Sequence, residues 1–167
     1  SNGSVMPFFL NKKNKGEKFI PITDDQMTRF NITLQDGCEM VFYAIEKAWG
    51  GEVFVPKIPS YKISDVATAI APGLEKKIVG IRPGEKLHEE MITASDSFST
   101  VDLGKYYAIL PQKSPYSQYS KDDYKKALNG TDVPNGFSYS SGNNTDWESI
   151  ESLRELVKIH VDPNFKV

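Results

Sequence analysis

A chain of 167 residues with 39% hydrophobic content is long enough to bury the core of one ordinary domain. Charged residues make up 25% of it and nearly cancel to a formal charge of −2, so no overall field favours nucleic acid or an anionic membrane as a partner. Its apolar runs are far shorter than the roughly 20 residues of a membrane-spanning helix, and its first residues lack the pattern of a secretory signal. The single Cys38 excludes an intramolecular disulfide, which predicts a cytoplasmic location.

The first part of the chain predicts alternating strands and helices. A short strand is expected over 19–23, where Pro21 marks a sheet edge or a strand end. The clearest helix begins after Thr33, an N-cap with Asp36 three residues on, and ends at Gly50. Further elements are expected in this order: a strand over 52–55, a helix capped by Ser60 or Ser64 that ends before Pro72, a strand over 77–81, and a short helix over 85–92.

Two of these helices have an apolar stripe with helical spacing, which is typical of one packed face. On the longer helix the stripe consists of Leu34, Cys38, Val41, Phe42, Ile45 and Ala48. On the shorter helix it consists of Ile63, Val66, Ala67 and Ile70.

The remainder of the chain predicts a hairpin, a polar arm and a final helix. Strands over 100–103 and 106–110 flank Gly104. A Ser-, Tyr-, Asn- and Gly-rich arm over 112–144 contains one short helix near 122–128. Thr145-Asp146-Trp147-Glu148 offers a capping box for a last helix that ends at His160. The predicted class is therefore α/β: a small mixed sheet with helices in residues 1–111, then an arm and terminal helix in residues 112–167.

The most distinctive segment runs from Ile81 through Arg82-Pro83-Gly84-Glu85 to Met91. A helix beginning at this turn would offer free backbone N–H groups, while Arg82 matches the geometry of a phosphate and Glu85 can accept from two ribose hydroxyls. A nucleoside diphosphate would satisfy all three. The alternative interpretation is structural, with Glu85 complementing the helix dipole and Arg82 pairing with a nearby carboxylate.

Three other patterns are candidate sites. Arg29 is a single cation in an apolar stretch, so a fixed partner is expected, either a carboxylate such as Asp24 or Asp25 or a ligand phosphate. Tyr43 and Lys47 have the spacing of a dehydrogenase catalytic pair, yet no glycine-rich dinucleotide turn accompanies them, so a surface pair on one helix face is expected.

His88 could act as a base, but beside Glu89 and Glu90 we expect an ordinary surface residue. No metal site is expected, because His88 and His160 are far apart in the sequence and there is only one cysteine.

Four collinear segments resemble one known family: 3–9, 22–30, 58–63 and 82–91. They are similar to the inverting UDP-N-acetylglucosamine 4,6-dehydratases, members of the extended short-chain dehydrogenase/reductase class that act in capsule and flagellin-glycan synthesis. The resemblance extends to the end of the chain and includes the motif over 139–144 before a tryptophan and a helix.

The resemblance implies roles for five residues as substrate-binding groups. Ser4 and Val5 fall where the family's chain enters the substrate domain and lines the UDP site. Arg29 and Arg82 fall on arginines that contact the phosphates, and Glu85 falls on a glutamate that contacts the ribose. These positions agree with the charge argument made from the residues themselves.

The resemblance also implies what this sequence lacks. The family's NADP turn, its catalytic Tyr-x-x-x-Lys and its Asp-Lys pair would all precede Ser1, so no catalytic residue and no cofactor are expected in this chain, which we interpret as a fragment. Its expected partners are UDP-N-acetylglucosamine or a related UDP-sugar, the absent Rossmann domain, and further copies of itself in a homo-oligomer. Two alternatives stay open: the same domain of a 4-epimerase, and a noncatalytic module that binds a partner chain.

Overall fold

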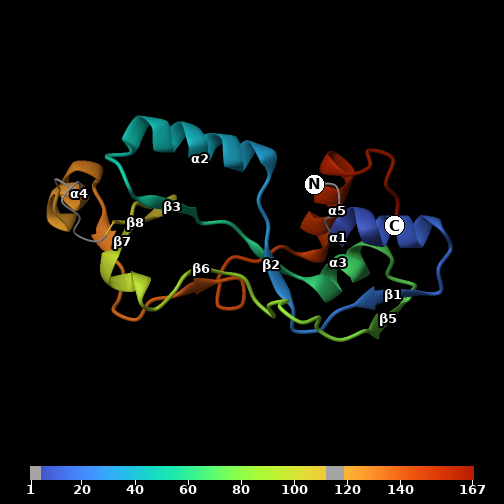
Figure 1. Cartoon of the computed structure of the whole chain (residues 1–167). Coiled ribbons are helices and arrows are strands. Elements are labelled where there is room, and N and C mark those ends of the chain that lie inside the picture. Colours follow the sequence, from blue (N-terminus) through green and yellow to red (C-terminus); the bar gives the residue numbers. More distant parts are fainter. Residues whose placement is uncertain (1–4, 112–118) are drawn as a thin grey trace. The chain divides into compact units, whose positions relative to one another are not determined.

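The structure is a computed structural model that describes residues 5–111 and 119–167 (Figure 1). In chain order its elements are α1 (Val5–Asn14), β1 (Phe19–Ile22), β2 (Thr28–Phe30), α2 (Leu34–Lys47), β3 (Val53–Pro56), β4 (Ser60–Lys62), α3 (Ile63–Ile70), β5 (Glu75–Ile78), β6 (Glu90–Ile92), the 3-10 helix η1 (Asp96–Ser99), β7 (Thr100–Asp102), β8 (Tyr106–Ile109), α4 (Lys121–Leu128), β9 (Thr131–Asp132), β10 (Tyr139–Ser140) and α5 (Ile150–His160). Within this part of the chain no helix is long and apolar enough to cross a membrane.

The α/β class is confirmed, with the strands divided among small sheets. β1 and β5 form a parallel pair, whereas β2–β4, β6–β10 and the four-stranded sheet β3-β8-β7-β9 are antiparallel. Pro21 is accommodated because a two-stranded sheet consists only of edges. The sequence patterns missed helix α1 and the strands β2 and β4, and a strand of three residues is too short to show alternation.

The chain folds into two compact units that interleave along the sequence. Unit 1 comprises Ser1–Asn31, Pro59–Glu89 and Ser141–Val167. Unit 2 comprises Ile32–Ile58 and Glu90–Ser140. The division at residue 111 into a substrate-binding domain and an arm stays a prediction about function.

Unit 1 is built around the apolar face of α3. Its four predicted stripe residues are all buried, which confirms that face. Side chains of α1, β1 and α5 complete the cluster, among them Phe9, Leu10, Ile20, Ile22, Leu153 and Val157. Figure 1 shows the three helices beside the β1–β5 pair. This core holds β2, β4 and the 82–89 segment in place around the candidate site.

Both predicted caps in unit 1 were wrong. Lys62 occupies the N-cap of α3 without a side-chain hydrogen bond, because Ser60 belongs to β4, where its backbone pairs with Asp146 and Glu148. Helix α5 is capped by Ser149, whose hydroxyl accepts from the Ser152 amide at 3.0 Å.

Unit 2 carries the predicted hairpin and the predicted long helix. β7 and β8 pair on either side of Gly104, whose φ of 83° suits only glycine at this turn. The capping box of α2 is formed, with Thr33 and Asp36 exchanging hydrogen bonds.

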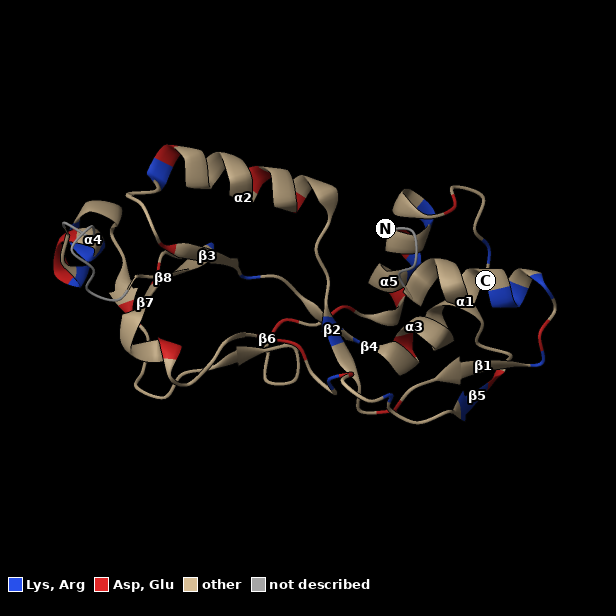
Figure 2. Ribbon diagram, viewed as in Figure 1, with Lys and Arg blue, Asp and Glu red and all other residues tan. Residues whose placement is uncertain are grey.

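The apolar stripe of α2 does not pack on unit 2. Tyr43 holds the helix on the sheet, with ring centroids 5.5 Å from Phe54 and 4.6 Å from Tyr106. Phe42 and Ile45 are 70% and 76% exposed, and no residue of α2 is buried. Figure 2 shows this helix as mostly uncharged along its length. One side of α2 is therefore an uncovered apolar surface.

Candidate functional site

A pocket of about 340 Å³ in unit 1 brings together most of the residues predicted from the sequence. Val5, Arg29, Arg82 and Glu85 all line it, from α1, β2 and the turn after β5. Its remaining walls are largely apolar and come from Phe8, Phe9, Pro21, Thr23, Met27, Tyr61, Ile63 and Val79. Ser4, the fifth predicted residue, lies outside the described residues. A pocket of this size with a few polar groups on apolar walls is typical of a small-molecule site.

Arg29 is held at the pocket wall by several contacts. Its Nη1 donates to the Thr28 carbonyl at 2.6 Å and to the Leu87 carbonyl at 3.3 Å. Two carboxylates flank it, with Nη2 3.8 Å from Glu85 Oε1 and Nε 3.8 Å from Glu89 Oε1. The side chain remains 19% exposed.

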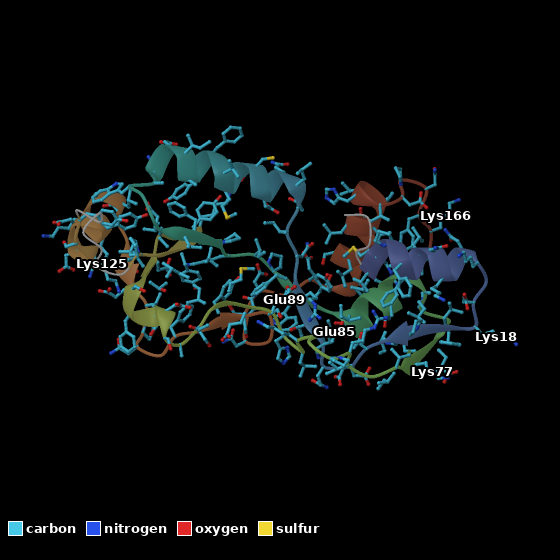
Figure 3. All side chains as sticks on the ribbon, in the orientation of Figure 1. Lys18, Lys77, Glu85, Glu89, Lys125 and Lys166 are labelled. Atoms are coloured by element: carbon cyan, nitrogen blue, oxygen red, sulfur yellow. The ribbon has the colours of Figure 1, made fainter. Side chains whose placement is uncertain are left out.

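The expected partners Asp24 and Asp25 were therefore wrong. The partners come from a turn nearly sixty residues later, which local sequence could not indicate. Figure 3 labels Glu85 and Glu89 on this turn. Both ion pairs are longer than a hydrogen bond, so the guanidinium retains donors for an anionic group in the pocket.

The segment after Arg82 is a turn and not the predicted helix. Arg82 and Glu85 close it reciprocally: the Glu85 amide donates to the Arg82 carbonyl at 3.0 Å, and the Arg82 amide donates to Glu85 Oε2 at 3.2 Å. Gly84 has φ of 83°, a conformation that glycine adopts without strain. The anion trap therefore lacks a helix N-terminus and depends on the two arginine side chains.

The predicted helix fails because its backbone groups pair with distant segments. The Leu87 carbonyl accepts from the Thr28 amide at 3.0 Å, and the Glu89 carbonyl accepts from the Ser141 amide at 2.8 Å. The next residues form β6, which pairs with β10. Tertiary pairing therefore replaces the local i to i−4 bonds that a helix would need.

Tyr61 closes one side of the pocket from β4, directly across the β2–β4 ladder from Arg29. Burial raises the pKa of Tyr61 to about 12, and the negative charge of Glu89 adds to the rise while Arg29 opposes it. At neutral pH the phenol therefore keeps its proton and can act as a hydrogen-bond donor.

A row of hydrogen bonds through two hydroxyls begins at Thr28, the residue that precedes Arg29. Thr28 Oγ1 is 2.7 Å from both Ser141 Oγ and His88 Nδ1, and the Glu89 amide donates to Ser141 Oγ at 2.9 Å. Thr28 and Ser141 are 2% and 0% exposed. The expectation of His88 as a surface residue was wrong, since the ring is half-buried against Thr28.

The sequence did not single out Thr28 or Ser141 as functional residues. Their only signal was polarity inside otherwise patterned segments, and 113 positions separate them. Such a pairing is set by the tertiary fold, which no local spacing can predict.

Two other features carry no comparable site. Tyr43 packs among aromatic rings while Lys47 pairs with Glu46 at 2.7 Å, so the two do not form the expected surface pair. A wider hollow of about 780 Å³ lies along α4, but Lys125 and Asp132 at its rim already pair with each other at 2.6 Å. Among the described residues, no group of three or more His, Cys, Asp or Glu could hold a metal ion.

Comparison with known proteins gives the family. Residues 1–111 match the polysaccharide biosynthesis protein family. The chain belongs to this family.

Similar proteins have named activities. A UDP-N-acetylglucosamine 4,6-dehydratase (inverting) from Campylobacter jejuni subsp. jejuni serotype O:2 is 48% identical over 162 residues, which cover 94% of this chain and 47% of the relative. A UDP-glucose 4-epimerase from Rickettsia canadensis is 34% identical over 163 residues, which cover 94% of this chain and 46% of the relative. The chain thus spans about half the length of the curated relatives it matches.

A solved structure supports the same fold. The X-ray structure of Pen from Bacillus thuringiensis has a TM-score of 0.72 and 28% sequence identity, and it covers 94% of this chain and 46% of that chain. Val5, Arg29, Arg82 and Glu85 all fall within the residues matched to the polysaccharide biosynthesis family. Ser141 falls outside them.

Proposed function

We propose that this chain is the UDP-sugar-binding portion of an NADP-dependent, C5-inverting UDP-N-acetylglucosamine 4,6-dehydratase of bacterial surface-polysaccharide or glycan biosynthesis. One observation carries the proposal: Val5, Arg29, Arg82 and Glu85, separated widely in the sequence, line one pocket. The Campylobacter dehydratase at 48% identity supports this assignment over the epimerase at 34%.

Different residues of the pocket would contact different parts of the nucleotide. Arg29 and Arg82 supply donors that suit the two phosphates, whereas Glu85 supplies a carboxylate that can accept from ribose hydroxyls. Glu85 also lies 3.8 Å from Arg29, so a phosphate at Arg29 would compete with the carboxylate and release it toward the ribose. Binding energy from this end of the substrate would orient the sugar for reaction elsewhere.

This chain does not fit a dinucleotide cofactor. Its 167 residues contain no Gly-x-Gly-x-x-Gly turn, and the described residues of the pocket walls include no glycine for close approach of a pyrophosphate. We therefore assign no cofactor contact and no reaction step to these residues. In the proposed enzyme NADP would be held by the part of the protein that corresponds to the other half of the relatives' length.

The exposed apolar face of α2 supports the presence of a further domain that packs on it. A helix with this much exposed apolar surface gains little stability from its own unit, and large exposed apolar patches mark interaction sites. The relatives are about twice as long as the matched region, so we propose that their additional domain covers the α2 face. When that domain is absent, a second copy of the chain would take its place, which fits the expected homo-oligomer.

Isothermal titration with UDP and with UDP-N-acetylglucosamine tests the proposed binding. Arg82→Ala and Glu85→Ala should each weaken binding by about 1–3 kcal/mol, the typical loss for a charged hydrogen bond. Lys18→Ala removes an exposed charge outside the pocket and should bind as the unmodified chain does. Equal affinity in all three variants would exclude the site.

A further inference from the structure

We propose that Ser141 is a positioning residue for the pocket and acts through a directed chain of hydrogen bonds. The chain runs from the Glu89 amide through Ser141 and Thr28 to His88. It fixes the wall on which Arg29 sits. The inference rests on the proposed function, because that wall matters only if a ligand meets Arg29.

The direction of the chain follows from its donors. The Glu89 N–H can only donate, so Ser141 Oγ accepts from it. If the Ser141 hydroxyl donates to Thr28 Oγ1, the Thr28 hydroxyl is free to donate to His88 Nδ1, and each proton has an acceptor.

The reverse direction leaves a proton without an acceptor. If His88 Nδ1 donated to Thr28, one hydroxyl proton would be left without an acceptor among the contacts of its described neighbours: that of Ser141 if Thr28 donates to Ser141, or that of Thr28 if Ser141 donates to Thr28. Ser141 is 0% exposed, so water cannot supply one without rearrangement. An unsatisfied buried donor is costly. The geometry therefore assigns His88 Nδ1 as the acceptor from Thr28 and places the ring proton on Nε2.

The hydrogen-bond series connects to Arg29 through the residues that precede and follow it in the sequence. Thr28 precedes Arg29, and the Thr28 carbonyl and the Leu87 carbonyl both accept from Arg29 Nη1. Glu89 follows His88, donates its amide to Ser141 and places its carboxylate on the Phe30 amide at 2.9 Å.

The residues on either side of Arg29 are thus tied to the 87–89 segment, and Ser141 joins both. Removing the Ser141 hydroxyl would loosen the Thr28 and Glu89 ends together. The Arg29 guanidinium and the neighbouring Glu89 carboxylate would then no longer be held in a fixed relative position.

Nuclear magnetic resonance of the full chain tests the direction without any ligand. The ring nitrogens of His88 should report the Nε2–H tautomer, while His160, on the exposed last turn of α5, serves as an internal reference. Thr28→Val removes the donor to His88 Nδ1 and should move the Nδ1 resonance toward that of His160, whereas Ser141→Ala keeps that donor and should preserve the tautomer. Both variants should shift the Arg29 Nε–H resonance. Thr28→Ser retains a hydroxyl and should preserve both signals.

A fourth variant guards against loss of folding. His88→Ala removes the half-buried ring at the end of the hydrogen-bond series, where water can take its place. This variant should shift the Arg29 resonance while leaving the fold intact. A His88 ring with its proton on Nδ1, or an Arg29 resonance unchanged in His88→Ala and Ser141→Ala, would overturn the proposal.

Titration with UDP then separates this inference from the proposed function. Ser141→Ala should bind UDP on the order of tenfold more weakly, and Thr28→Ser should retain affinity. If the unmodified chain binds UDP and Ser141→Ala binds it equally, the positioning role is refuted while the function stands. If the unmodified chain binds no UDP, the proposed function of this chain fails and the positioning role, which depends on it, fails with it.

Discussion

Thr28 Oγ1 lies 2.7 Å from Ser141 Oγ, although 113 positions separate the two residues, and both are almost completely buried. Removing either hydroxyl takes away one of the other's two hydrogen-bond partners and leaves Ser141 only the Glu89 amide, or Thr28 only His88 Nδ1. We expect Thr28→Val and Ser141→Ala each to lower the free energy of unfolding by about 1–3 kcal/mol.

The double variant separates a shared bond from two independent losses. It should cost less than the sum of the single variants, because the bond between the two hydroxyls is lost in each single variant but can be lost only once in the double variant. Urea unfolding followed by circular dichroism measures all three. Thr145→Val, at an exposed threonine, should stay within about 0.5 kcal/mol of the unmodified chain. Strictly additive effects would contradict a direct bond between the two hydroxyls.

Gly142 provides a steric test of the same region. A Cβ at this position would lie 2.7 to 2.9 Å from three atoms of the His88 ring. Gly142→Ala should therefore destabilise the chain by about 1–3 kcal/mol, as overpacking does. Gly37→Ala is the matched control, since its Cβ would meet nothing within 4 Å, and an alanine inside α2 should add about 0.5–1 kcal/mol. Thermal unfolding of the two variants should move in opposite directions.

Tyr61 predicts a loss of stability at alkaline pH. Burial raises the pKa of this phenol from 10.0 to about 12, so above pH 10 the unfolded chain releases its proton while the folded chain keeps it. Folded stability is therefore present below pH 10 and falls as the pH rises toward 12.

The Tyr61→Phe variant isolates this contribution. Between pH 8 and pH 11 it should lose about 1 kcal/mol less unfolding free energy than the unmodified chain, because phenylalanine has no proton to release. Urea titrations at the two pH values give the comparison. An identical loss in both proteins would show that the phenol ionises as readily in the folded chain as in the unfolded one.

The α2 face predicts self-association of the isolated chain. Phe42 and Ile45 are largely exposed on it, so Phe42→Glu with Ile45→Glu should remove association at little cost to stability. Sedimentation velocity over a range of concentrations measures the effect. Ile159→Glu changes an equally exposed residue on α5 and should leave association as it is. A monomer at every concentration before mutation would count against this surface.

Local patterns predicted those elements whose partners are close in the sequence. The α2 capping box and the β7–β8 hairpin form as predicted because each is settled within a few residues. The predicted helix over 85–92 was wrong because the Leu87 and Glu89 carbonyls accept from Thr28 and Ser141. A pattern of neighbouring residues cannot show that distant backbone groups will replace the hydrogen bonds of a helix.

The same distinction holds for the site. Arg29, Arg82 and Glu85 were chosen for chemistry that single side chains possess, and the structure places them around one pocket. The carboxylates beside Arg29 and the paired hydroxyls of Thr28 and Ser141 could not be predicted, since only the folded chain brings them within reach.

The interleaved arrangement of the units has a consequence for synthesis. Helix α5 belongs to unit 1, and Arg154 Nε donates to the Ala69 carbonyl across 85 positions of the chain. Synthesis from the N-terminus makes all of unit 2 before residues 141–167, which finish unit 1. Until those residues are made, the part of the α3 face that α5 covers stays exposed, and contacts of such long range form slowly. Nascent chains halted before Leu153 should be the species that chaperones hold and proteases cleave.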